Sequence, residues 1–346
     1  MEIIKNTGFI PVPTTDTDFV AGAVSGITYR EVLPSGNWTD YLPTDEFQNG
    51  GLETMACVTF SGSNCLEMQL NRLVMEDLIP DKILDEMRDL GYFDVYGLAN
   101  FSDRFTAKMD GTTTAGNSMP NVWNAIRHYG LIGEAGWPSV WTTWGDYYRG
   151  IPQALKDRAL KFLNYFDVLY EYITNGGRLD LAVAQYHLKQ APIHIASAVC
   201  SGWNVIQAPV IQKCNEPINH ATAIYNADDI YYDNDSYGPY KKKLAGDYNI
   251  PFALKGILIP KFILKQSIMS KLIRKKNTQE VFLVLNGKRY WIKDVDNFDD
   301  LVKEQPVTVS WEQVEVVDIF TQPYGGEIIG KANLADALKI MFGKVN

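Results

Sequence analysis

The residues of this sequence best suited to chemistry are a cysteine, a histidine and an aspartate that lie far apart in the chain. Cys57 stands near the start of a predicted helix, and His220 enters a predicted strand 163 residues later. A thiol attacks as its thiolate, which a helix N-terminus and a neighbouring imidazolium both stabilise. Asp235, fifteen residues after His220, could accept a ring N–H and fix the tautomer. Together they could supply a nucleophilic thiol, a base and an orienting carboxylate.

The other cysteines and histidines give no comparable pattern. A lone cysteine near a helix start is most often a buried small apolar residue, so Cys57 depends on its context. We expect six further residues to be core or surface side chains: Cys65, Cys200, Cys214, His128, His187 and His194. No C-x-x-C spacing occurs, and we predict neither a metal site nor a cofactor.

Two ligand-binding motifs are excluded on their spacing. Residues 233–238 begin like a calcium loop, but Tyr237 and Leu244 occupy its fifth and twelfth positions, which require oxygen ligands. Neither a P-loop nor a dinucleotide fingerprint is present.

The context of Cys57 resembles the papain-like cysteine peptidases. The stretch Cys57-Val58-Thr59-Phe60-Ser61 is similar to the Cys-Trp-Ala-Phe-Ser that opens the central helix of that family, and Glu67 stands where the family has a Glu. Similar segments follow in the family's order over residues 37–259: 38–43, 48–50, 101–105, 116–120, 125–138, 190–195, 219–221 and 235–238. The resemblance implies a papain-like fold with a helical and a β-rich half, of a divergent prokaryotic or phage type.

The same resemblance implies roles for particular residues. Cys57 would form the acyl-enzyme, His220 would be the base, and Asp235 would replace the family's orienting Asn. Gln48 would stabilise the oxyanion, although it lies nine residues before the cysteine where the family usually has six. The implied substrate-binding residues are Asn117 and Ser118, which replace the family's Gly-Gly, and Asn219.

The implied function is peptide-bond hydrolysis on a polypeptide substrate, and two alternatives stay open. One is a peptidoglycan endopeptidase or amidase on the same fold, because every such enzyme needs the same nucleophile and base. The other is a non-catalytic papain-fold component of a phage particle.

Composition excludes several classes of protein and partner. The 346 residues are 46% hydrophobic and 21% charged, which excludes a disordered chain, a collagen and a coiled-coil rod. A net charge of −9 gives no global reason to bind nucleic acid. No apolar run reaches the ~20 residues of a membrane-spanning helix. The N-terminus shows no signal-peptide pattern, so we expect the cytoplasm or a virion rather than secretion through a signal.

Hydrophobic periodicity predicts a helical first half and a strand-rich second half, and therefore an α+β fold. We expect helices over residues 54–73, 81–90, 119–129, 151–174 and 180–190. We expect strands over residues 193–197, 221–225 and 252–258.

The predicted organisation has four parts. Residues 1–47 form an N-terminal arm packing on the main domain, and residues 48–259 form the papain-like catalytic domain. Residues 260–276 form a basic amphipathic linker helix, since residues 255–276 hold seven basic and no acidic residues. Such a helix could instead lie on a membrane or an acidic partner. Residues 277–346 form a small α+β module, opened by a hairpin at Asn286-Gly287, for a protein or cell-wall partner.

Overall fold

The computed structural model describes residues 8–13, 31–139, 143–199, 203, 210–213 and 215–262, and five strands beyond residue 271. The chain forms two compact units, one of residues 1–76 and 81–262 and the other of residues 77–80 and 263–346. Of the described residues, none forms a helix long and apolar enough to cross a membrane.

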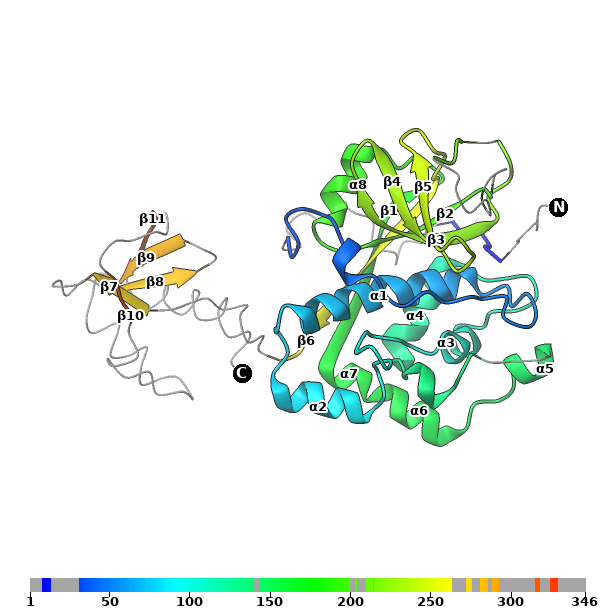
Figure 1. Cartoon of the computed structure of the whole chain (residues 1–346), viewed down its shortest axis with the longest axis horizontal. Coiled ribbons are helices and arrows are strands. Elements are labelled where there is room, and N and C mark those ends of the chain that lie inside the picture. Colours follow the sequence, from blue (N-terminus) through cyan, green and yellow to red (C-terminus); the bar gives the residue numbers. More distant parts are fainter. Residues whose placement is uncertain are drawn as a thin grey trace. The chain divides into compact units, whose positions relative to one another are not determined.

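Helix α1 (Cys57–Met75) forms the centre of the first unit. It is buried from Cys57 to Leu73, contacting α3 and α4 in the helical half and β2, β3 and β6 of the sheet. Figure 1 shows it running between these two halves. The other helices are α2 (Asp81–Asp89), α3 (Asp103–Met109), α4 (Met119–Tyr129), α5 (Trp144–Tyr147), α6 (Gln153–Leu160), α7 (Phe162–Tyr165) and α8 (Leu181–Leu188), with 3-10 turns at Thr39–Tyr41 and Glu134–Gly136.

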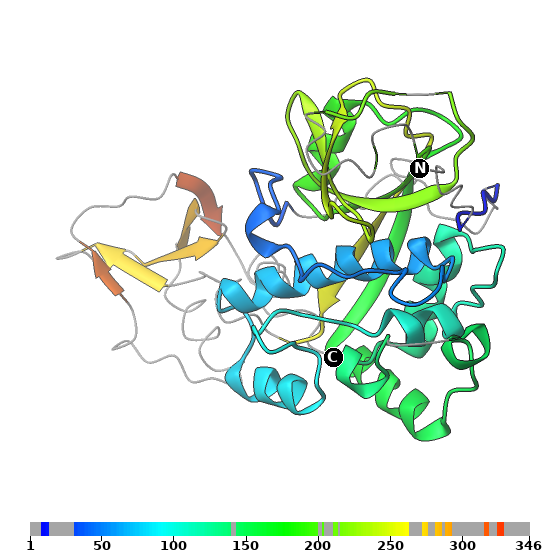
Figure 2. The ribbon, with the colours of Figure 1, turned by 45° about the vertical axis from the view of Figure 1, so that its right-hand side comes forward.

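A six-stranded antiparallel sheet forms the other half, in the order β1-β6-β2-β3-β4-β5. Its strands are β1 (Phe166–Asn175), β2 (Ile193–Ser197), β3 (His220–Ala227), β4 (Ile230–Asn234), β5 (Lys241–Ala245) and β6 (Phe252–Pro260). Figure 2 shows its curvature above α1. Because β3 contacts α1, a side chain at the start of β3 can lie near the start of the helix.

The predicted α+β class and most predicted elements are confirmed. Helices α1, α2, α4 and α8 and strands β2, β3 and β6 lie where the periodicity placed them, within a few residues. The helix predicted over residues 151–174 is wrong in its second half, because β1 replaces it after α6 and α7. Phe166, Val168, Tyr170 and Tyr172 are buried along β1, which pairs with β6 over its whole length.

The described residues of the predicted arm belong to the first unit and contact the rest of it at several places, among them the buried residues Phe9 and Trp38. Phe9 forms a parallel bridge with Asn117, and its ring lies 5.2 Å from that of Phe252. The fully buried indole of Trp38 donates a 2.7 Å hydrogen bond to the carbonyl oxygen of Leu188.

The second unit contains a five-stranded mixed sheet in the order β10-β7-β8-β9-β11. Its strands are β7 (Leu272–Lys275), β8 (Val281–Leu285), β9 (Lys288–Ile292), β10 (Glu315–Val317) and β11 (Tyr324–Ile328). The predicted hairpin is confirmed, since β8 and β9 pair antiparallel up to Leu285 and Lys288.

The linker helix predicted over residues 260–276 is wrong at both ends. Pro260 ends β6, and Leu272–Lys275 form β7, which pairs with β8. The apolar pair Leu272 and Ile273 suits a paired strand as well as a helix. Residues 263–271 lie outside the described residues.

Candidate active site

Cys57 is the first residue of α1 and is fully buried. The carbonyl of Ala56 accepts the N–H groups of Thr59 and Phe60, which starts the helix directly at the cysteine. The chain enters this turn through Met55 in a left-handed conformation, with φ at 56°. The thiol therefore belongs to the positive end of a 19-residue helix, where a negative charge is stabilised.

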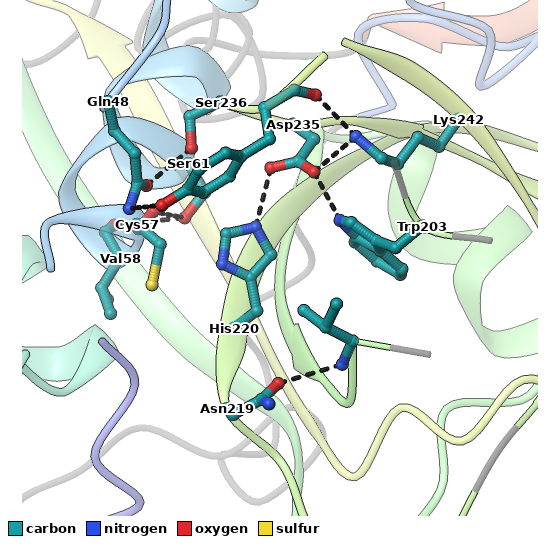
Figure 3. Close-up of polar contacts among 12 residues, drawn as sticks. Gln48, Cys57, Val58, Ser61, Trp203, Asn219, His220, Asp235, Ser236 and Lys242 are labelled. Carbon is teal, nitrogen blue, oxygen red and sulfur yellow. Dashed lines mark hydrogen bonds and ion pairs between the residues drawn. The ribbon is translucent and has the colours of Figure 1, made fainter. Parts of the chain in front are cut away.

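His220 begins β3 and lies between Cys57 and Asp235. Its Nε2 is 2.7 Å from Oδ1 of Asp235, a residue just after β4, and the ring also hydrogen-bonds the Cys57 side chain. Figure 3 shows the Cys57 sulfur facing the ring edge opposite the carboxylate. Three residues predicted from distant parts of the sequence thus meet at one place. None of the three is more than 2% exposed.

The charges of this group favour an ionised pair. Burial alone would lower the pKa of His220, but the Asp235 carboxylate, together with hydrogen bonds to Asp235 and Cys57, raises it to about 10. Burial would raise the pKa of Asp235, yet His220 and Lys242 lower it to about 2. The ring therefore stays protonated and the carboxylate ionised at neutral pH.

Asp235 has two further partners that the sequence analysis did not single out. Its Oδ2 accepts from the indole Nε1 of Trp203 at 2.7 Å and from Lys242 Nζ at 2.6 Å (Figure 3). Lys242 lies in a run of three lysines, which indicates a solvated strand. Its burial has a sequence signal, because it shares a strand face with the apolar Leu244, two residues on.

Gln48 is fully buried beside the group, with its amide occupied by other side chains. Its Nε2 donates to Oε1 of Glu53 at 2.7 Å and to the Tyr237 hydroxyl at 2.9 Å, and its Oε1 accepts from Ser236 at 2.7 Å. To bind an oxyanion, the amide must exchange one of these donations. The tyrosine also donates to Oε2 of Glu53, and its ring lies 5.5 Å from that of His220.

The predicted substrate-binding residues are engaged within the chain. The N–H of Asn117 donates to the carbonyl of Gly8 at 2.8 Å, and its carbonyl accepts from the N–H of Ile10 at 2.7 Å. The buried Ser118 precedes α4. Oδ1 of Asn219 accepts from the N–H of Val199 at 2.9 Å, so that its side chain supports the residues after β2.

Two other histidines lie in the core, as predicted. His194 hydrogen-bonds Ser61 at 2.8 Å and the Trp123 indole at 3.1 Å, and burial lowers its pKa to about 3. Burial, aided by the nearby Lys255, lowers the pKa of His187 to about 4. Within the described part of the chain, no group of three His, Cys, Asp or Glu residues could hold a metal ion.

Comparison with known proteins gives matches in structure and none in sequence. No protein-family model matches the sequence, and no curated protein sequence matches it. Several solved structures are similar. Xylellain, a cysteine protease from Xylella fastidiosa, matches with a TM-score of 0.51 and 12% identity, over 75% of this chain and 97% of xylellain.

Two further solved structures match with lower TM-scores. The bromelain protease from Ananas comosus, in complex with the E64 inhibitor, has a TM-score of 0.43 at 15% identity, over 64% of this chain and 97% of bromelain. Procathepsin L 3 from the larval midgut of Tenebrio molitor has a TM-score of 0.46 at 15% identity, over 73% and 76% of the two chains. At identities this low, structural similarity shows a shared fold and does not show a shared activity. The chain has a papain-like fold, the fold of the cysteine protease xylellain.

Proposed function

We propose that this protein is a cysteine peptidase that hydrolyses peptide bonds through an acyl-enzyme on Cys57. The observation that carries the proposal is the position of His220, between a thiol at a helix N-terminus and a buried carboxylate. A papain-like fold around this group supports the same reaction class. Nothing in the group requires a cofactor.

Each member of the group has a chemical role in this proposal. The Cys57 thiolate attacks the carbonyl carbon of the scissile bond, and the protonated His220 then gives its proton to the leaving amine. Water, deprotonated by the ring, hydrolyses the thioester and releases the acid. Asp235 keeps the ring oriented and stays ionised throughout, since its pKa lies near 2.

Stabilisation of the oxyanion comes from donors at the start of α1. The first N–H groups of a helix have no intrahelical acceptor, and that of Cys57 lies next to the reacting sulfur. Gln48 is the second donor in our proposal, once substrate displaces its contact with Glu53 or Tyr237. Binding of the substrate backbone at Asn117 and Ser118, with Asn219 beside the base, completes the proposed site.

The experiment compares thiol reactivity with turnover in the full-length chain. Iodoacetamide at about pH 6 should label Cys57 fastest, because the helix N-terminus and the His220 imidazolium both stabilise negative charge on its sulfur during attack. Cys57→Ala should abolish hydrolysis of casein, and Cys65→Ala, also buried on α1, is the matched control and should not. Equal labelling of all cysteines, or labelling of Cys57 only after denaturation, would contradict the assignment.

Cell wall incubated beside casein separates the possible targets. Release of soluble peptidoglycan fragments without cleavage of casein would move the proposal to a cell-wall endopeptidase or amidase. A reactive Cys57 with neither activity would favour self-processing or a non-catalytic role.

A further inference from the structure

We infer that Lys242 is a positioning residue of this site, whose ammonium group balances Asp235 and sets how tightly His220 holds its proton. This rests on the proposed function and deepens it. The observation behind it is that the carboxylate beside the histidine is shared between two cationic groups rather than bound by one.

The ammonium group is fixed in place by hydrogen bonds. Lys242 Nζ lies 2.6 Å from Oδ2 of Asp235, 2.6 Å from the carbonyl oxygen of Tyr237 and 2.7 Å from that of Pro239. Three acceptors match the three protons of an ammonium. The side chains of Lys242 and Asp235 are 1% and 0% exposed, so solvent does not screen their attraction.

The two carboxylate oxygens of Asp235 have different partners. Oδ1 faces His220, and Oδ2 receives Lys242 together with the Trp203 indole. With the thiolate of the proposed mechanism, thiolate, imidazolium, carboxylate and ammonium alternate in sign and sum to zero. Without the ammonium, a full buried negative charge would act on the imidazolium alone.

The other ionisable groups near the pair come from neighbouring elements. On β4, Asp233 stands opposite Lys242 in register and is buried. Burial, then repulsion from Asp235, raises its pKa to about 7. On α1, Cys57 acts on the opposite side of the ring, and Tyr237 lies against the ring from the β4–β5 connection. Lys242 therefore offsets, together with the imidazolium, two neighbouring carboxyl groups: Asp233 on β4 and Asp235 just after it.

The resemblance to papain-like peptidases gives this pair a meaning. Where that family has a neutral Asn, this chain has Asp235 and, seven residues on, a buried lysine. An ion pair of aspartate and lysine has the same net charge as one asparagine. In this pair the Asp235 carboxylate orients His220, and the Lys242 ammonium weakens the attraction of that carboxylate for the His220 proton. This is the proton that the base must give to the leaving amine.

The test is a double-mutant cycle read on the basic limb of the pH–activity profile and on the titration of His220 by NMR of histidine-labelled protein. Lys242→Met should move both midpoints up by about one pH unit, because Asp235 then acts uncompensated on the ring. Asp235→Asn should move both down, since a buried ammonium remains beside the ring. The double variant should return towards the wild type, which a merely structural role would not produce.

Matched controls are available on the same strand. Lys243→Met removes a charge from the exposed face of β5 and should shift neither midpoint. Lys242→Arg keeps the charge and should stay near the wild-type midpoints. An unmoved midpoint in folded Lys242→Met, or a shift in the same direction as Asp235→Asn, would overturn the inference.

Two outcomes keep this test apart from that of the proposed function. If the chain shows no peptidase activity, the NMR titration of His220 still reports the effect of Lys242. If Lys242→Met does not fold, the double variant decides, because it removes the Asp235 carboxylate together with the ammonium that pairs with it. A double variant that titrates like Asp235→Asn alone would refute the role of Lys242.

Discussion

Asp110 offers a test of how a buried carboxyl group holds the start of α1 in place. Its Oδ2 accepts from the Thr59 hydroxyl at 2.8 Å, and its Oδ1 accepts from the N–H and hydroxyl of Thr112 at 2.8 and 2.6 Å. Its backbone carbonyl accepts from the Asn117 side chain at 3.0 Å. The residue thus ties the helix that begins with Cys57 to the loop before α4. Burial raises its pKa to about 7, despite these hydrogen bonds.

The sign of the effect on stability follows from proton linkage. The folded protein binds the Asp110 proton more tightly than the unfolded chain, where the pKa is near its ordinary 3.8. The stability that it contributes is therefore complete below that value and is lost as pH rises to about 7. At 1.36 kcal/mol per pKa unit, the loss is about 4 kcal/mol, of which about 3 kcal/mol falls between pH 4.5 and 8.5.

Replacement of Asp110 by Asn removes this dependence while keeping a side chain that can bond both threonines. The difference in free energy of unfolding between Asp110→Asn and the wild type should rise in favour of the variant by about 3 kcal/mol from pH 4.5 to 8.5. Urea unfolding at four pH values, followed by tryptophan fluorescence, measures it. Asp89→Asn, at an exposed position, is the control and should show a constant difference. A constant difference for Asp110→Asn as well would refute the reasoning.

Two further predictions concern the ends of the chain. Deletion of residues 1–13 frees the backbone groups of Asn117 and should raise kcat/KM for a short peptide about tenfold. The reason is that a tethered segment competes with substrate at high effective concentration. An unchanged kcat/KM would show that substrate does not pair with Asn117. A chain that ends at Phe262, where the first compact unit ends, should stay soluble and keep the proposed peptidase activity. Aggregation, or loss of cooperative unfolding in a thermal melt, would show that the first unit needs the second unit to fold.

Cys57, His220 and Asp235, which the structure brings together, could be singled out from the sequence because the motifs around them occur in the order of a known family. The bounds of helix α4 could also be predicted from the sequence, since Pro120 lies in its first turn and Gly130 at its end. Strand β1 could not be. Its run of aromatic and apolar residues fits a helix on periodicity, and only pairing with β6, some 80 residues on, makes it a strand.

The burial of Lys242 could be predicted only in part, because its strand face indicates burial and its two lysine neighbours do not. A lysine between two lysines is usually solvated, and here Asp235 and two backbone carbonyls provide the acceptors that make its burial possible. The role predicted for Gln48 rests on the resemblance of residues 48–50 to the Gln-Gly of papain-like peptidases. Its contacts with Glu53 and Tyr237 depend on a loop whose course no local pattern determines.

The burial of α1 on all sides has a consequence for the motions of the site. A helix packed by both halves of its unit opens only when those halves separate, so its amides should exchange with solvent hydrogen as slowly as any in the protein. Cys57 is therefore attached to an element that should open slowly, whereas His220 begins β3 and Asp235 lies just after β4. Local fluctuation should therefore change the distance between Cys57 and His220 mainly by moving the sheet side of the site. The Cys57 side chain should then move less than the two groups on the sheet.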